Sequence, residues 1–115
     1  MSRKSHRDMT ARRLAYASFF AALGDETRLS LIAKLCGGQP RSISQLREGS
    51  KLTRQAITKH LRVLERAEIL HSVRTGRESR FEFNPQAIEG IKEYLDFVSE
   101  EWDRALSRLK SFVER

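Results

Sequence analysis

The hydrophobic residues of this 115-residue chain change their spacing twice, and this limits the folds that the chain can adopt. They recur every three or four positions up to Arg66, alternate with polar residues from Ile69 to Phe83, and return to helical spacing up to Val113. A period near 3.6 residues indicates an amphipathic helix, and alternation indicates a half-buried strand. The sequence therefore predicts a mainly α-helical domain with one β-hairpin.

Two helices are predicted at the start of the domain. The first covers residues 9–23, after a basic arm at residues 1–8 that lacks periodicity and is expected to be flexible. Asp25 is a favourable N-cap for the second helix, and the glycines and proline at positions 37, 38 and 40 end it. The residues expected to face the core on this second helix are Leu29, Ile32, Ala33 and Cys36.

The next segment has the pattern of two short helices joined by a tight turn. Ser42 and Gln45 have the spacing of a capping box, and Gly49 lies in the turn that follows. Thr53 is a favourable N-cap for a helix that continues to Arg66. The apolar residues of this helix share one face and its basic residues the other, which predicts a helix-turn-helix motif.

A hairpin and a last helix complete the predicted domain. Ile69, His71 and Val73 are expected on one face of the first strand, and residues 75–78 form the turn. Asn84–Pro85 ends the second strand and begins the last helix. The apolar stripe of that helix, from Ile88 to Val113, is longer than one small domain needs to bury, which favours packing against a partner helix.

The charge of the chain is strongly positive and unevenly distributed. The net charge is +7, and residues 1–84 carry 17 Lys and Arg against 8 Asp and Glu, whereas residues 85–115 carry 5 against 7. A basic surface attracts phosphate polyanions or anionic lipid. No apolar run approaches the roughly 20 residues of a membrane span, so no membrane partner is expected.

The outward face of the helix after Thr53 is the strongest candidate for function. It presents Arg54, Gln55, Thr58, Lys59 and Arg62, with no acid before Glu65. Arginine and glutamine make bidentate contacts with guanine and adenine edges, and lysine and threonine suit phosphates. The alternative is an ordinary solvated helix face. Arg77 and Arg80, in the hairpin, are expected to contact the DNA backbone or a minor groove, unless they only provide solubility.

Three motifs carry a resemblance to a known family: residues 22–29 (ALGDETRL), residues 58–64 (TKHLRVL) and Gly76–Arg77. Their order and spacing resemble those of the ArsR/SmtB winged helix-turn-helix repressors, and the match covers roughly residues 18–83. The segment around Glu101–Trp102–Asp103 resembles the branch of that family without metal sites. One departure is Glu68, where the family usually has a glycine suited to a left-handed helix end.

The resemblance implies a homodimer on duplex DNA, with the first and last helices at the dimer interface. The residues expected to contact DNA are Ser42, Gln45, Thr53, Arg54, Gln55, Thr58, Lys59, Arg62, Arg77 and Arg80. The residues expected in the dimer interface are Leu14, Phe20, Leu95, Val98, Trp102, Leu106 and Leu109. A small-molecule inducer stays open as a further partner.

Neither a metal site, a cofactor nor an enzyme activity is expected. The helix at residues 43–47 lacks the thiolate pair of metal-sensing relatives, and the last helix has acids but no histidine. No phosphate-binding loop or nucleophile–base pair is present in the sequence. His60 is interpreted as a half-buried structural residue, and the single cysteine, Cys36, as a small core residue in a reducing cytoplasm.

The function predicted from these observations is that of a sequence-specific transcriptional regulator, a repressor by the resemblance. Two other hypotheses remain open at this stage. The basic face could bind an acidic protein instead of DNA, since charge alone does not separate these partners. The chain could also act as a ligand- or thiol-responsive sensor, for which Cys36 would need exposure and a depressed pKa.

Overall fold

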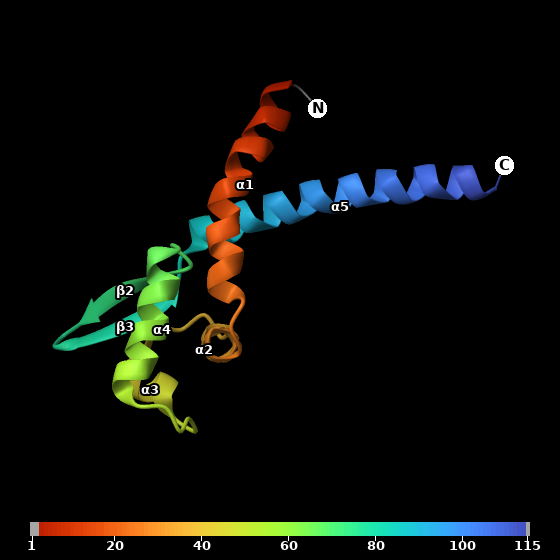
Figure 1. Cartoon of the computed structure of the whole chain (residues 1–115). Helices are drawn as coiled ribbons and strands as arrows, with labels where there is room; N and C mark the ends of the chain where they lie inside the picture. The colour runs from red at the N-terminus through yellow and green to blue at the C-terminus, as the bar shows by residue number, and fades with distance from the viewer. Residues whose placement is uncertain (1–2, 115) are drawn as a thin grey trace.

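The computed structural model describes residues 3–114, with side chains from residue 12 onward. Five helices and three short strands follow one another along the chain (Figure 1): α1 (Arg3–Leu23), α2 (Glu26–Leu35), β1 (Arg41–Ser42), α3 (Ile43–Arg47), α4 (Arg54–Arg66), β2 (Leu70–Thr75), β3 (Glu78–Phe83) and α5 (Pro85–Val113). The mainly helical prediction and its element order are confirmed.

The helix starts lie where the capping residues predicted them. The side chains of Asp25, Ser42, Thr53 and Asn84 each accept a hydrogen bond from a backbone N–H of the first turn that follows. At Ser42 the capping box is complete, because Gln45 Oε1 also accepts from the Ser42 N–H at 2.9 Å. Short-range polar chemistry therefore fixes where α2, α3, α4 and α5 begin.

The first helix begins earlier than the sequence predicted. The backbone of α1 is helical from Arg3, so residues 3–8 continue the helix in the segment expected as a flexible arm; residues 1–2 lie outside the described part. This segment contains neither glycine nor proline, and its arginines and lysine have high helix propensity. No residue in it therefore interrupts a helix that extends backwards from the packed part of α1.

The orientation predicted for α2 was wrong. Its buried residues are Leu31 and Leu35, whereas Leu29 is 51% exposed and Ala33 and Cys36 are exposed as well. The helix carries two apolar stripes at helical spacing, and α4 covers the other one. Cys36 is consequently an exposed residue at the C-cap of α2 rather than part of the core.

The hairpin belongs to a three-stranded antiparallel sheet in the order β1-β3-β2, one strand more than predicted. Arg41 pairs with Phe81, and Leu70 pairs with Phe83. The buried face of the hairpin contains Leu70 and Phe81, and the half-buried His71 and Val73 lie on its other face. Ile69 is buried just ahead of β2, where α4 turns into the strand.

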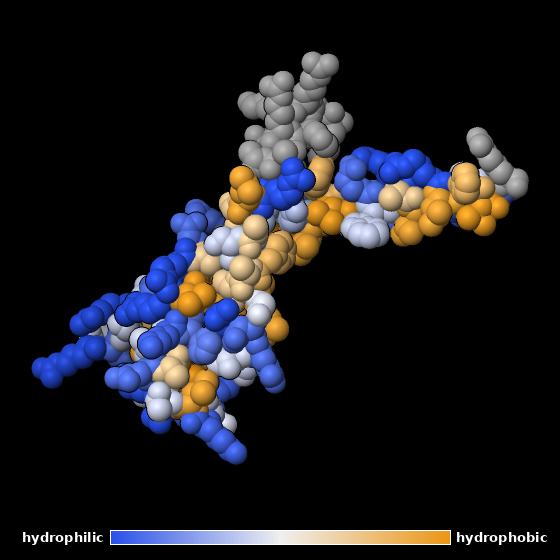
Figure 2. Space-filling model, viewed as in Figure 1, coloured by the Kyte–Doolittle hydropathy of each residue, from blue (hydrophilic) through white to orange (hydrophobic). Residues whose placement is uncertain are grey.

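One core joins the helix-turn-helix to the hairpin. It consists of Phe19, Ala22, Leu31, Leu35, Leu46, Ile57, Leu61, Leu64, Ile69, Leu70, Phe81 and Ile91. Beyond Ile91, α5 leaves this body, and the molecule measures 64 × 30 × 22 Å. Figure 2 shows hydrophilic side chains over the helix-turn-helix and hairpin, and hydrophobic ones along the projecting α5.

Candidate DNA-binding surface

Two side chains from outside α4 hold the helix-turn-helix in shape. Lys34 Nζ, on α2, donates to the carbonyls of Leu46 and Glu48 at 2.8 Å each, where α3 ends. A cation at that position satisfies carbonyls that have no partner within the helix. Arg47 Nε donates to the Leu52 carbonyl at 3.0 Å and closes the turn between α3 and α4.

The outward face of α4 contains the basic and polar residues that the sequence predicted there. Arg54, Gln55, Lys59 and Arg62 are exposed, and Thr58 is half-buried. Arg54 Nη1 donates to Ser44 Oγ at 3.3 Å, and Thr58 Oγ1 donates to the Arg54 carbonyl at 2.8 Å. The five residues form a continuous, solvent-accessible, cationic helix face, which has the chemistry needed to contact phosphates and base edges.

Arg62 is connected to the hairpin through Glu65. Arg62 Nη1 donates to Glu65 Oε1 at 2.7 Å, and Ser72 Oγ, on β2, donates to Glu65 Oε2 at 2.6 Å. The hydrogen bond from Ser72, followed by that from Arg62, holds the pKa of Glu65 below its ordinary value. The sequence analysis missed this link, although Glu65 is the first acid on the basic face.

Three of the residues expected to contact DNA act as caps in the structure. Ser42 is 4% exposed, and its Oγ accepts from the Gln45 N–H at 3.1 Å, so Ser42 is not available on the surface. Gln45 is exposed, but its Oε1 is occupied by the Ser42 N–H. Thr53 is exposed at the N-terminus of α4, and its Oγ1 accepts from the Ala56 N–H at 3.1 Å.

The tip of the hairpin presents a second cationic group. Gly76 adopts φ 64° in the turn, and the adjacent Arg77 is exposed. Arg80 Nε donates to Glu78 Oε2 at 3.1 Å, so the charge of Arg80 is partly neutralised within the hairpin. The hairpin and α4 are packed together through Leu64 and Leu70, so the two cationic groups belong to one rigid body.

The α4–β2 junction adopts the left-handed helix end that the sequence indicated. Glu68 has φ 63°, the Glu68 N–H donates to the Glu65 carbonyl at 2.9 Å, and the Ile69 N–H donates to the Leu64 carbonyl at 3.0 Å. These two bonds define a Schellman motif. Asn84 Nδ2 donates to the Glu68 carbonyl at 3.1 Å and connects the junction to the start of α5.

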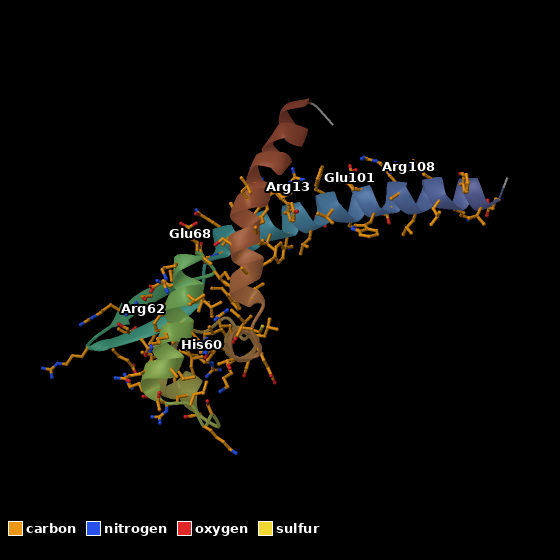
Figure 3. The ribbon with its side chains drawn as sticks, in the orientation of Figure 1. Arg13, His60, Arg62, Glu68, Glu101 and Arg108 are labelled. Atoms are coloured by element: carbon orange, nitrogen blue, oxygen red, sulfur yellow. The ribbon has the colours of Figure 1, made fainter. Side chains whose placement is uncertain are left out.

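His60 lies on the opposite side of α4 from Arg62, and Figure 3 shows the two residues directed toward α2 and toward the hairpin respectively. His60 is half-buried, as expected. Its Nδ1 lies 3.2 Å from Arg28 Nη1 and 3.9 Å from Asp25 Oδ2, so its partners are side chains rather than the backbone. No local spacing indicates this contact, because Arg28 and His60 are 32 positions apart.

The residues expected in a dimer interface form an apolar surface on the single chain. Leu14 is 82% exposed and Trp102 is 64% exposed, and Val98 is half-buried. The other exposed large apolar residues on α1 and α5 are Phe20, Leu95, Leu106, Leu109, Phe112 and Val113. A patch of this extent is unusual on a monomeric protein and marks an interaction site.

The described part of the chain contains no group of three or more His, Cys, Asp and Glu residues placed to hold a metal ion. Within the same residues, no helix is long and apolar enough to cross a membrane.

Comparisons with known proteins agree with this geometry. The family described as "Helix-turn-helix domain" matches residues 23–73. The HTH-type transcriptional regulator Rv2034 of Mycobacterium tuberculosis is 26% identical over 93 residues, which make up 81% of this chain and 83% of that protein. An ArsR-like transcriptional regulator from Rhodococcus sp. RHA1 is 35% identical and superposes with a TM-score of 0.76, covering 89% of this chain and 95% of that chain.

A further solved structure shares the fold. It is the homodimeric winged helix-turn-helix DNA-binding domain of Mb0332 from Mycobacterium bovis, described as a possible ArsR-family transcriptional regulator. The two chains are 16% identical, with a TM-score of 0.63 over 88% of this chain and 89% of that chain. At this identity the likeness concerns the fold alone.

Proposed function

Because this chain belongs to the ArsR family of DNA-binding transcriptional regulators, we propose that it acts as a homodimeric repressor on a pseudo-palindromic operator. The family and the fold are those of regulators, not of enzymes. The observation that carries the proposal is the exposed, cationic outward face of α4, presented next to the arginines of the hairpin. Binding of the dimer over a promoter would occlude the polymerase.

In this proposal α4 is the recognition helix. Arg54 and Gln55 lie in its first turn, the part of a recognition helix that contacts base edges in the major groove. Thr53, Thr58, Lys59 and Arg62 contact phosphates or further base edges, and Gln45, exposed on α3, contributes its amide group. Arg77 and Arg80 add backbone or minor-groove contacts from the hairpin.

The proposed dimer joins the apolar surfaces of α1 and α5. Burying Leu14, Trp102 and their apolar neighbours against a second copy removes hydrophobic surface from water. A symmetric pair of recognition helices matches the two half-sites of a pseudo-palindrome, about one helical turn or ~34–36 Å apart. The Mycobacterium bovis protein, a homodimer of the same fold, supports this assembly.

The recognition helix is tested by fluorescence anisotropy on the DNA upstream of the chain's own gene and on a shuffled duplex of equal length. The wild type is expected to prefer the upstream duplex. Arg54→Ala and Gln55→Ala are each expected to reduce that preference about tenfold or more, because each removes one bidentate base contact. Arg108→Ala, which removes a cation from the far end of α5 (Figure 3), is the matched control and should keep the preference. Unchanged preference in Arg54→Ala and Gln55→Ala would exclude α4 as the recognition helix.

The dimer is tested separately by sedimentation equilibrium. Trp102→Glu places a charge in the exposed apolar stripe of α5 and is expected to yield monomers that lose operator binding, because one recognition helix covers only one half-site. Ser107→Glu adds the same charge at an exposed polar position of α5 and should leave the dimer intact. A monomeric wild type that binds the operator would contradict the proposed assembly.

A further inference from the structure

Arg28 connects α1, α2 and α4 through a single side chain. Arg28 lies on α2, its Nε donates to the carbonyl of Ala22 in the last turn of α1 at 2.5 Å, and its Nη1 lies 3.2 Å from His60 Nδ1 on α4. The backbone N–H of Arg28 donates to Asp25 Oδ2 at 3.0 Å, which fixes the start of α2. The guanidinium is therefore held by the Ala22 carbonyl, and the backbone of Arg28 by Asp25, where the side chain meets His60.

The chemistry of this contact selects the tautomer of His60 that can form it. A guanidinium has only donors, so Nδ1 must accept, and in a neutral imidazole the proton then lies on Nε2. The carboxylate of Asp25 is 3.9 Å from the same nitrogen, too far for a hydrogen bond, and it lies beside Arg28 as a counter-charge. In this hydrogen bond His60 Nδ1 is the acceptor and Arg28 is the donor.

A directional contact at this position adds to what the core of α4 provides. Ile57, Leu61 and Leu64 are buried and select the inward face of α4, but apolar contacts depend less on exact alignment than a hydrogen bond does. A hydrogen bond requires distance and alignment together, so Arg28–His60 restricts rotation of α4 about its own axis. The outward residues turn with the helix, so the same bond sets where they point.

We propose that His60 is a positioning residue for DNA recognition. Its Nδ1, held by Arg28, fixes the rotation of α4 against α1 and α2 and so directs Arg54 and Gln55 toward the base edges. In the proposed dimer, α1 belongs to the interface, and this contact transmits the geometry of the dimer to each recognition helix. The inference rests on the proposed function, in which α4 enters the major groove.

Two variants at one position separate positioning from folding. His60→Leu keeps the apolar bulk and removes the acceptor. His60→Asn keeps an acceptor, because the amide Oδ1 stands the same number of bonds from Cα as the imidazole Nδ1. Both are compared with the wild type by anisotropy on the preferred and shuffled duplexes, at a temperature where circular dichroism shows all three proteins folded.

The expected result is a loss of discrimination without a loss of general affinity. His60→Leu should lower the ratio of preferred to shuffled affinity about tenfold, the size of a hydrogen bond to a charged donor, with shuffled binding unchanged. His60→Asn should restore most of the ratio. Arg28→Lys, which lacks the forked donors needed to contact Ala22 and His60 together, should behave like His60→Leu.

The outcomes that overturn the inference are distinct from those that overturn the proposed function. A wild type without duplex preference removes the proposed function and the inference with it. A wild type with preference, matched by an equal preference in His60→Leu, removes the inference alone. An equal fall in the affinity of His60→Leu for both duplexes also contradicts the inference, because it would show that His60 supports folding and not positioning.

Discussion

The side chains of Glu65 and Ser72 join the recognition helix to the hairpin: Ser72 Oγ donates to Glu65 Oε2 at 2.6 Å. The other carboxylate oxygen accepts from Arg62 at 2.7 Å. One carboxylate therefore holds β2 and an exposed arginine of α4 in a single arrangement. If Arg62 contacts DNA as proposed, this orientation leaves less side-chain freedom to be lost on binding.

Acid should weaken this link. The hydrogen bonds from Ser72 and Arg62 lower the pKa of Glu65 from its ordinary value of 4.5, so the folded state favours the ionised form more than the unfolded state does. Stability from this carboxylate is present above about pH 4.5 and is lost as the pH falls through the lower folded-state pKa. Urea denaturation of the wild type and Glu65→Gln should show a stability gap at pH 7 that closes toward pH 3.

The matched control for this titration is Glu89→Gln. Glu89 is exposed on α5, and its nearest cation, Lys92 Nζ, is 3.9 Å away. This substitution should leave the pH profile of stability as in the wild type. A gap between wild type and Glu65→Gln that is as wide at pH 3 as at pH 7 would show that the charge of Glu65 contributes nothing to the link.

Glycine at position 68 should stabilise the protein. Glu68 has φ 63°, a conformation that costs a residue with a Cβ about 1 kcal/mol and glycine almost nothing. Glu68→Gly is therefore expected to raise the free energy of unfolding by about 1 kcal/mol, measured by urea or thermal denaturation. Glu68→Ala removes the same carboxylate but keeps the Cβ, and equal stabilisation by alanine would assign the effect to charge.

Removing the α3 cap should affect stability without affecting recognition. Ser42 is buried and its Oγ serves the Gln45 N–H, so Ser42→Ala is expected to cost about 1 kcal/mol of unfolding free energy. Its operator affinity, measured where the variant is fully folded, should equal that of the wild type. If Ser42→Ala is as stable as the wild type but has a reduced operator preference, Ser42 contacts DNA rather than serving only as a cap.

The hairpin arginines should be distinguishable by the salt dependence of binding. Arg77→Ala is expected to reduce the slope of log affinity against log salt concentration by about 0.9 if it removes one phosphate contact. Arg80 must exchange Glu78 for a phosphate, so Glu78→Gln should strengthen binding to any duplex. Equal slopes for wild type and Arg77→Ala would mean that the hairpin tip stays away from the phosphate backbone.

Helix caps could be predicted from the sequence, whereas the face that a helix buries against its neighbours could not. The caps at Asp25, Thr53 and Asn84 involve atoms within a few residues, so residue type and spacing were sufficient. The α2 helix offers two apolar stripes of similar quality, and only the position of α4 decides that Leu31 is buried and Cys36 is exposed.

The third strand and the side-chain links were unpredictable for a related reason. β1 has two residues, and its pairing joins Arg41 to Phe81, far away in the sequence, so no local period indicates it. The bond between Arg28 and His60 likewise joins residues 32 positions apart. The basic face of α4, in contrast, could be predicted because helical periodicity alone determines which residues share a face.

In the proposed dimer, the helical structure of the projecting part of α5 depends on the protein concentration. From Ser99 to Glu114 its side chains are exposed except for Ala105, which is half-buried, and an unsupported helix of this length is marginal in water. In the proposed dimer the second copy supplies the missing support. When the protein concentration is below the dissociation constant of the dimer, mass action makes the dimer concentration increase with the square of the total protein concentration. Dilution therefore dissociates the dimer and lowers operator binding. In the same range, a modest rise in protein synthesis produces a steeper rise in operator occupancy.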